Sequence, residues 1–520
     1  MSKPINIIDL FAGPGGLGEG FSSFKNNGKP AFSIRMSVEK EESAHKTLTL
    51  RAFYRALSSK KQRNFYHEYV AGRISKEEMI SALPQEWAHA NEETLGFPAE
   101  LGIDNESIHK RLRELRRQHA GESWMVIGGP PCQAYSLAGR SRNKGIEGYR
   151  AEADHRHFLY QEYLEVLDII QPNVFVMENV KGILTSAVGG EKMFPKIHRD
   201  LEHPAAVIRG KSTKTGRRYK IYSLVVPPSE MGLFGPEYPS DSSYIIKAEN
   251  FGIPQARHRV ILLGLSEEVG GEPGLLQTRS ITNIEQVLMG LPALRSKLSK
   301  GIDSPDRWAS AINDQAELVF AKSKERTELR KVAEHMLDAV RGLKVNASTS
   351  ATKYAGISKT KGYDDLVDWL LNDQPEALLN HESRGHIPGD LGRYLFCSSW
   401  AELNRGKENN IPKAKDFPQV LWPKHANWES GAFTDRFRVQ ARGRPATTIT
   451  SHISKDGHYF IHFDPKQCRS LTVREAARIQ TFPDNYFFEG NRTQQYVQVG
   501  NAVPPFLATQ IAELIHKVAG

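Results

Sequence analysis

A cysteine that follows two prolines is a strong candidate for chemistry in this sequence. The segment Gly129-Pro130-Pro131-Cys132 comes directly after a short apolar run at residues 124–128. Proline stiffens the backbone, so the turn presents the thiol outward from the end of an expected strand. A lone cysteine is usually a buried structural residue. This rigid, glycine-flanked setting instead favours a nucleophile, whose thiolate form needs positive charge nearby.

Positive charge does follow this cysteine in the sequence. Residues 137–157 contain three glycines and a set of basic side chains, namely Arg140, Arg142, Lys144, Arg150 and Arg156. We expect a mobile basic loop that can close on a phosphate backbone. A solvated charged loop explains the same residues equally well.

An acid and two arginines form a second group of candidates. Glu178-Asn179 ends another apolar run, and a carboxylic acid there can donate to a ring nitrogen and accept from an exocyclic amine. Arg257 and Arg259 open a further run, and alternate residues of a strand share one face. Both guanidinium groups could therefore orient a carboxylate or a base carbonyl. From the spacing alone, structural ion pairing is the favoured interpretation.

A glycine-rich turn supplies a possible ligand site. Gly13-Pro14-Gly15-Gly16-Leu-Gly18 follows an apolar run and satisfies GxGxxG, and Glu39 stands where a ribose-binding acid is expected. The pattern does not separate NAD, FAD and S-adenosylmethionine, and a glycine turn that only packs helix on strand remains the plainer alternative. Asp9 and Phe11 flank the turn. Phe11 could stack on the adenine of a flat, cationic ligand, which favours a ligand other than a dinucleotide.

These candidates sit at the ends of short apolar runs that alternate with helical patterns. Residues 5–10, 124–128, 173–178 and 259–265 are each expected to form buried parallel strands. Between the second and third, apolar residues recur at helical spacing and predict a crossover helix: Leu159, Tyr163, Val166, Leu167 and Ile170. The pattern predicts a doubly wound α/β fold with a mostly parallel sheet.

Two stretches interrupt this rhythm and suggest the domain organisation. We expect a catalytic domain at residues 1–299 with a helical insertion at about 47–121, a separate domain at 300–450, and a return to the first domain at 451–520. Residues 471–481 and 505–518 are expected to be helical. A chain of 520 residues is long enough for two folded units.

Composition limits the possible classes of function. The formal net charge of +9 fits a polyanionic partner, nucleic acid first, although many basic proteins have none. Three scattered cysteines, Cys132, Cys397 and Cys468, argue against a disulfide framework or a CxxC metal site, and we expect a reducing compartment and no metal. No apolar run approaches the roughly 20 residues of a membrane span, and the N-terminus does not look like a secretory signal.

Six motifs in one order resemble those of the cytosine-5 DNA methyltransferases. They are Asp9-Leu-Phe-Ala-Gly-Pro-Gly-Gly16 for the cofactor loop, Pro131-Cys132-Gln133 for the nucleophile, Glu178-Asn179-Val180 for ENV, Gln255-Ala-Arg257-His-Arg259 for QxRxR, Arg474-Glu-Ala-Ala-Arg478 for the late helix, and Gly500-Asn501-Ala-Val503-Pro504-Pro505 for the closing motif. The match covers roughly residues 1–45, 120–265 and 465–515. The resemblance implies a bacterial or phage enzyme with a Rossmann-like methyltransferase core and a smaller target recognition domain at about 300–450, whose return to DNA lies near residues 445–450.

The resemblance also implies a mechanism and the residues that perform it. Cys132 would attack carbon 6 of a flipped-out cytosine, Glu178 would hold N3 and the exocyclic amine, and Arg257 and Arg259 would hold Glu178 and the base carbonyl. S-adenosylmethionine, leaving as S-adenosylhomocysteine, would bind at Asp9, Phe11, Ala12, Gly13, Pro14, Gly15, Gly16, Glu39, Leu101, Gly129, Pro131, Leu159, Asn501 and Ala502. DNA contacts would come from Gln133, Ser136, Asn179, Arg140 and Arg142. The acid for the adenine amine stays open between Glu100-Leu101 and Asp104.

Duplex DNA is the expected substrate, in restriction-modification or phage defence, with a cognate endonuclease or defence protein as a possible partner. We expect a monomer in the cytoplasm, associated with the nucleoid and not with a membrane. A tRNA cytosine-5 methyltransferase is the alternative with the same motifs. A nicotinamide or flavin oxidoreductase would leave Cys132, Glu178 and the paired arginines without roles, and a non-catalytic DNA-binding subunit would not need them.

Overall fold

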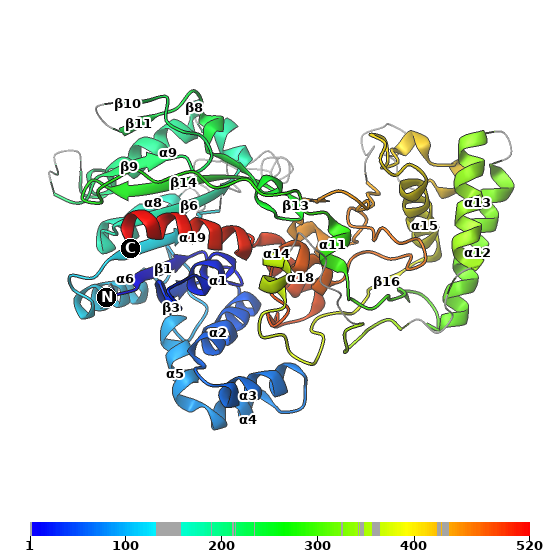
Figure 1. Ribbon diagram of the computed structural model, residues 1–520, viewed down its shortest axis with the longest axis horizontal. Helices are drawn as coiled ribbons and strands as arrows, with labels where there is room; N and C mark the ends of the chain where they lie inside the picture. Colours follow the sequence, from blue (N-terminus) through cyan, green and yellow to red (C-terminus); the bar gives the residue numbers. More distant parts are fainter. Residues whose placement is uncertain are drawn as a thin grey trace.

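The computed structural model describes residues 3–131, 158–188, 190–210, 213, 215–232, 235–323, 326–341, 343, 348–355, 364–423, 428 and 436–520. The predictions for Cys132, Gln133, Ser136, Arg140 and Arg142 lie outside these residues. Figure 1 shows two units: one is built around a sheet and contains both termini, and the other contains the helices α12 (Pro305–Lys322), α13 (Thr327–Arg341) and α15 (Pro388–Leu403).

A seven-stranded sheet forms the centre of the first unit. Its strands are β1 (Ile5–Leu10), β4 (Phe32–Val38), β5 (Trp124–Gly128), β6 (Val174–Val180), β9 (Tyr219–Tyr222), β12 (Ile245–Lys247) and β14 (His258–Ser266). They lie in the order β12-β14-β6-β5-β1-β4, and β9 also pairs with β14. The pairs β4–β1, β1–β5 and β5–β6 are parallel, while β14 is antiparallel to β6, β9 and β12. Six of the seven strands therefore run in one direction.

One strand prediction was wrong in its direction. Residues 259–265 form a strand as expected, but β14 runs against its neighbours instead of with them. A strand covered on both faces is apolar throughout whichever way it runs, so its composition carries no information on direction.

The sheet is covered by helices on both faces, which confirms the doubly wound α/β class (Figure 1). On one face, Ile5 and Ile7 of β1 share a core with α1 (Gly16–Ser23) and α19 (Pro505–Ala519). On the other, Ile8 and Leu10 share a core with α6 (Asn105–Gln118) and α8 (Phe158–Ile170), the predicted crossover helix. Successive residues of a strand point to opposite faces, so alternate side chains of one strand enter two cores.

Helices fill the stretch between β4 and β5. After α2 (Glu42–Ala56) come α3 (Lys60–Val70), α4 (Lys76–Ala82) and α5 (Pro84–Glu93), and α6 completes the stretch. Ser59 and Ser75 begin α3 and α4 with capping boxes, in which the serine side chain accepts from a backbone N–H of the first turn. α2 to α5 bury a small core, to which Leu379 from far along the chain also contributes.

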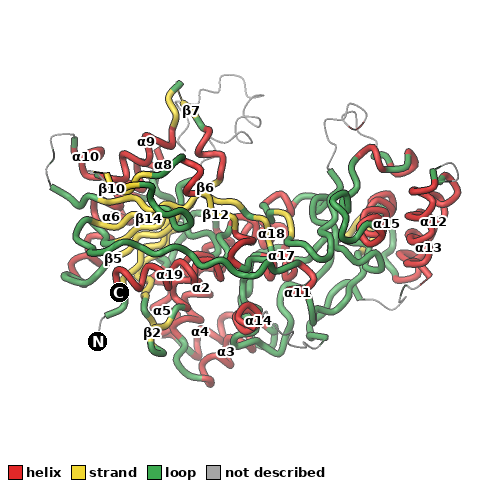
Figure 2. Tube along the Cα trace, turned by 45° about the horizontal axis from the view of Figure 1, so that its top comes forward, coloured by secondary structure: helices red, strands yellow, loops and turns green. Residues whose placement is uncertain are grey.

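The chain passes between the two units more than once. α12, α13 and α15 share a core with Ile461 and Cys468. In the sequence between α13 and α15, α14 (Asp364–Leu370) returns to the first unit. There the Trp369 indole N–H donates to the Thr481 carbonyl at 2.7 Å. Figures 1 and 2 both show α14 near α11 and away from α12 and α13.

The remaining elements are short or belong to the return of the chain. They are β2 (Lys25–Asn26), β3 (Lys29–Pro30), β7 (Ala187–Val188), β8 (Glu191–Lys192), α9 (Met193–Glu202), α10 (Pro204–Arg209), β10 (Glu230–Gly232), β11 (Gly235–Glu237), β13 (Gln255–Ala256), α11 (Ile284–Leu288), β15 (Lys297–Leu298), β16 (Gly385–His386), β17 (Ala446–Thr447), α17 (Val473–Ile479) and α18 (Arg492–Asn501). β13 pairs in parallel with β17, which joins the start of β14 to the return. Among the described helices, none has both the length and the apolar character required to cross a bilayer.

Candidate active site

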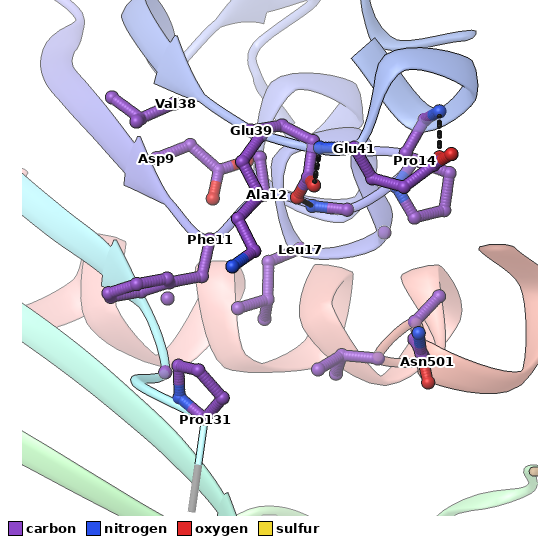
Figure 3. Close-up of a pocket in the computed structure, with 18 of the residues that line it drawn as sticks. Asp9, Phe11, Ala12, Pro14, Leu17, Val38, Glu39, Glu41, Pro131 and Asn501 are labelled. Atoms are coloured by element: carbon purple, nitrogen blue, oxygen red, sulfur yellow. Dashed lines mark hydrogen bonds between the residues drawn. The ribbon is translucent and has the colours of Figure 1, made fainter. Parts of the chain in front are cut away.

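A cavity of about 460 Å³ opens at the carboxyl ends of β1, β4, β5 and β6. This is the edge at which open α/β sheets bind ligands. Every predicted cofactor residue except Gly15 lines it (Figure 3): Asp9, Phe11, Ala12, Gly13, Pro14, Gly16, Glu39, Leu101, Gly129, Pro131, Leu159, Asn501 and Ala502. Residues up to about 490 positions apart in the sequence thus meet in one cavity.

The turn after β1 has a backbone that most residues avoid. Phe11 has φ of 52°, in the left-handed region, and Gly15 has φ of 94°. A bulky residue in this region stores strain of order 1 kcal/mol, and such strain gathers at ligand sites. In Figure 3 the Phe11 ring lies near Pro131. Gly15 faces the protein interior instead, because a Cβ on it would lie 2.9 Å from Leu48.

Glu39 is held by two backbone donors. Its Oε2 accepts from the Gly13 N–H at 2.8 Å, and its Oε1 accepts from the Glu41 N–H at 2.7 Å (Figure 3). Burial raises the pKa of the carboxyl above its ordinary value. Each oxygen keeps a further acceptor site, so the fixed carboxylate suits a pair of neighbouring hydroxyl groups.

The structure separates the two candidates for an acid near an adenine. Glu100 lines the cavity, and its Oε1 lies 2.7 Å from Nζ of Lys40, which also lines it. Asp104 does not line the cavity, and its Oδ2 accepts from the Glu100 N–H at 2.8 Å. Asp104 therefore orders the Glu100 backbone. Of these two acids, Glu100 is the one that lines the cavity.

Asp9 is a buried carboxyl without an ion-pair partner among the described residues. In the described part of the chain, neither of its carboxyl oxygens makes a hydrogen bond of ordinary geometry, although the Gly18 backbone N–H lies close enough to lower its pKa slightly. Burial raises its pKa from 3.8 to about 8, although Arg55 nearby opposes this shift. An unpartnered acceptor at a cavity that also contains Glu39 fits a ligand with donor groups or positive charge.

Glu178 lies at the junction between this cavity and the turn that precedes Cys132. Its Oε1 is 3.0 Å from Nε of Arg259, and it lines the cavity. A Cβ on Gly129 would lie 1.9 Å from the Glu178 carbonyl oxygen, so only glycine fits there. The Asn179 side-chain amide donates to the Pro130 carbonyl at 3.1 Å. Asn179 thus holds the Pro-Pro turn against the end of β6.

The two predicted arginines have different surroundings. Arg259 pairs with Glu178, as described. Arg257 is buried, and its guanidinium donates to the Ile449 carbonyl at 2.9 Å and to the Gly500 carbonyl at 3.4 Å. Burial holds the pKa of Arg257 well below its ordinary value. Arg257 therefore links the start of β14 to the return of the chain and to α18.

Some lining residues were not found from the sequence. They are Leu17, Val38, Lys40, Glu41, Ala44, Ala99, Gly128, Pro130, Val180, Val497, Gln498 and Val503. Lys40 and Glu41 directly follow Glu39, and Val497 lies one helical turn before Asn501, so adjacency and helical spacing could have found these. Glu100 is one of the two positions between which the sequence leaves the adenine acid open.

Comparison with known proteins identifies the family. The model of the C-5 cytosine-specific DNA methylase family matches residues 103–203 and 380–517. The type II methyltransferase M.Bpa9945I of Bacillus paralicheniformis is 33% identical over 530 residues, which cover 98% of each chain. The chain belongs to the C-5 cytosine-specific DNA methylase family. This confirms the resemblance of the motifs.

Two further relatives agree with this family. The DNA (cytosine-5-)-methyltransferase M.ApeKI of Aeropyrum pernix is 24% identical over 76% of this chain and 81% of its own. The crystal structure of a DNA modification methyltransferase encoded within a prophage (E. coli) has a TM-score of 0.50, with 17% identity over 99% of both chains, and shares the fold. Methylases of this family use S-adenosylmethionine in general, and the orphaned Asp9 carboxyl and the fixed Glu39 carboxylate fit a cationic ligand that carries ribose hydroxyls.

Proposed function

We propose that this protein transfers a methyl group from S-adenosylmethionine to carbon 5 of a cytosine flipped out of a specific duplex DNA sequence. The observation that carries the proposal is the Glu178–Arg259 pair, because Glu178 lines the cofactor cavity together with Pro130 and Pro131, the turn that precedes Cys132. In this arrangement a nucleophile, an acid and a methyl donor converge on one base.

The cavity residues could hold the cofactor between them. Glu39 would accept from the ribose hydroxyls, Phe11 would stack on the adenine, and Glu100 would accept from the adenine amine. Asp9 and the backbone of the Gly13–Gly16 turn would meet the amino-acid end, and Leu101, Leu159 and Asn501, which line the cavity, would close its sides. The bound cofactor supplies an electrophilic methyl group on its sulfonium sulfur.

The chain's own residues activate the base. The Cys132 thiolate forms a bond to carbon 6, while Glu178 donates to N3 and takes up the charge that moves into the ring, leaving carbon 5 nucleophilic. Arg259 holds Glu178 in place and faces the base carbonyl. Methyl transfer would leave S-adenosylhomocysteine, after which loss of the carbon-5 proton to a base, departure of the Cys132 thiolate and return of the N3 proton to Glu178 restore the neutral aromatic ring. Extrusion of the cytosine costs a few kcal/mol, which the pocket offsets.

The biological setting follows from the relatives. M.Bpa9945I is a type II methyltransferase, so we place this protein in a restriction-modification system, where a cognate endonuclease would share its target. The net charge of +9 supports a duplex DNA substrate. We expect a monomer that acts on DNA in the cytoplasm of a prokaryote, with Arg140, Arg142, Gln133 and Ser136 near the DNA.

Bisulfite sequencing tests this proposal directly. DNA from a methylation-deficient host that expresses the protein should show protected cytosines within one short motif, and Cys132→Ser should show none. The variant should still bind S-adenosylhomocysteine, because the cavity is built from other residues. Protection in tRNA without protection in DNA would contradict the DNA assignment, and normal turnover by Cys132→Ser would contradict the mechanism.

A further inference from the structure

A tyrosine far along the chain lies directly behind the cofactor loop. The hydroxyl of Tyr486 donates to the carbonyl oxygen of Pro14, and Tyr486 is fully buried. Pro14 lines the cavity from the other side. The same hydroxyl would lie 3.1 Å from a Cβ on Gly15. Tyr486 therefore supports both residues at the crest of the turn without entering the cavity.

The ring of Tyr486 is itself locked in place. The guanidinium carbon of Arg51 lies 4.7 Å from its centroid, and Phe482 packs at 4.7 Å between centroids. Arg51 is held in turn by Glu19 of α1, with Nε 2.7 Å from the Glu19 Oε2. Residues of α1, α2 and the segment after α17 thus hold one phenol in a fixed position.

The hydrogen bond is available over the working pH range. Burial raises the pKa of the Tyr486 phenol well above its ordinary value, so the hydroxyl keeps its proton. Within the described residues, the Tyr486 hydroxyl is the donor to the Pro14 carbonyl, and Tyr486→Phe removes it. A carbonyl that loses its buried partner is free to rotate with the turn.

We propose that Tyr486 is a positioning residue for the cofactor. It fixes the Pro14 carbonyl and through it the Gly13–Gly16 turn, whose Gly13 N–H also orients Glu39. The proposal rests on the proposed function, because it assumes that this cavity holds S-adenosylmethionine. It predicts that one buried hydroxyl, which never touches the cofactor, controls cofactor affinity.

Tyr66 provides a matched control. Its hydroxyl is also buried in this cluster and donates to a backbone carbonyl, that of Asn485, at 2.6 Å. Asn485 does not line the cavity. Tyr66→Phe and Tyr486→Phe therefore remove the same chemical group from the same core, and they differ in whether the acceptor belongs to the cofactor turn.

Calorimetric titration with S-adenosylhomocysteine tests whether Tyr486 positions the cofactor loop. Tyr486→Phe should raise its Kd by about tenfold, as for a hydrogen bond lost with its acceptor left buried, while Tyr66→Phe stays within about twofold. In steady state, Tyr486→Phe should raise the KM for S-adenosylmethionine with kcat and the KM for DNA nearly unchanged. A Kd for Tyr486→Phe within twofold of wild type, or an equal loss in Tyr66→Phe, would overturn the proposal.

Two further variants keep the result interpretable. Gly15→Ala places a methyl group against the same hydroxyl and against Leu48, so it should also weaken S-adenosylhomocysteine binding. This variant replaces Tyr486→Phe in the test if Tyr486→Phe does not fold. Normal binding by Gly15→Ala would then refute the proposal. Glu39→Gln tests the cavity itself. If Glu39→Gln weakens binding and Tyr486→Phe does not, the inference on Tyr486 fails alone; if wild type does not bind S-adenosylhomocysteine, the proposed function fails.

Discussion

Two arginines separated by one residue in the chain have different partners, and mutation should separate their roles. Arg259→Met removes the cation that holds Glu178, so the rate of methyl transfer should fall by about 10², while the thermal unfolding midpoint stays near that of wild type. Arg257→Met leaves the carbonyls of Ile449 and Gly500 without a donor, which should cost about 1–3 kcal/mol of stability.

Single-turnover methylation and thermal unfolding, measured on both variants, check this prediction. If Arg257→Met loses turnover as severely as Arg259→Met without losing stability, both arginines act on the reacting base, as the motif alone implies.

Asp9 should make the stability of the cofactor-free protein fall as the pH rises. Its pKa is about 8 in the folded state, because burial disfavours the carboxylate, against 3.8 as the ordinary value. A raised pKa means that the contribution to stability is complete below about pH 4 and is lost as the pH rises towards 8. Since asparagine does not titrate, Asp9→Asn should gain stability relative to wild type across this window.

Unfolding midpoints at pH 3, pH 5 and pH 8 provide the measurement, and Glu122→Gln provides a control of opposite sign, whose difference from wild type should change between pH 3 and pH 5 and stay constant between pH 5 and pH 8. The pKa of Glu122 is lowered to about 2 by hydrogen bonds from Asn6 and Lys3, so its contribution is present above about pH 4.5 and is lost as the pH falls through 2. An unchanged difference between wild type and Asp9→Asn from pH 4 to pH 8 would show that Asp9 is ionised in the folded protein.

At the residue scale, the motif residues of the cavity were predictable and their supports were not. Glu39 and Asn501 stand at motif positions that single-sequence reasoning recognises. Lys40 becomes relevant only because Glu100, 60 residues away, folds beside it. Tyr486 meets Pro14 across 472 residues. Contacts between residues this far apart in the sequence depend on the packed fold, and local residue spacing does not predict them.

At the scale of elements, the presence of strands and helices was predictable from apolar patterning, but strand direction was not. The four central strands β1, β5, β6 and β14 follow apolar runs bounded by glycine, proline or asparagine. The short edge strands β9 and β12 have three or four residues each, too few for a periodic signal. The reversal of β14 depends on the path of the chain through β9 and β12, which composition does not record.

The helices between β4 and β5 should depend on their own small core. Met79 of α4 is completely buried there, together with Phe53 and Leu83. Met79→Ala should lower the free energy of unfolding by about 2–4 kcal/mol, because the cavity that it leaves is only partly filled by relaxation. Met231 is 45% exposed, and Met231→Ala should change stability by less than about 0.5 kcal/mol.

Chemical denaturation of both methionine variants checks this expectation. An equal effect of the two substitutions would mean that the helices of this insertion do not pack as a separate core.

At the scale of the whole molecule, the chain passes between the two units more than once. Leu366 and Leu370 of α14 lie in the core of the first unit, and the Asp484 N–H donates to the Leu370 carbonyl at 2.7 Å. The Asn485 side chain donates to the Asn372 carbonyl at 2.8 Å. An exchange of residues 300–450 as one block would therefore break the wall behind the cofactor loop.

The return of α14 to the first unit determines which residues a domain exchange must keep. The recognition domain itself is still a prediction. A chimera that takes residues 300–450 from a relative with another target, but keeps residues 364–380 and 446–450, should methylate the relative's motif and retain the unfolding midpoint of wild type, because β17 and Ile449 also contact the first unit. A chimera that exchanges the whole block should methylate the same new motif but unfold at a lower temperature, because the contacts of Leu366, Leu370 and Trp369 are lost. Glu178→Ala should do the reverse, slowing methylation at every site by about 10² without changing the motif, since the proposed role of Glu178 is on the reacting base and not on its neighbours. Genome-wide bisulfite sequencing of all three shows the motif and the extent of methylation together. If both chimeras keep the original motif, base reading lies outside residues 300–450, and the helices between β4 and β5 become the next segment to exchange.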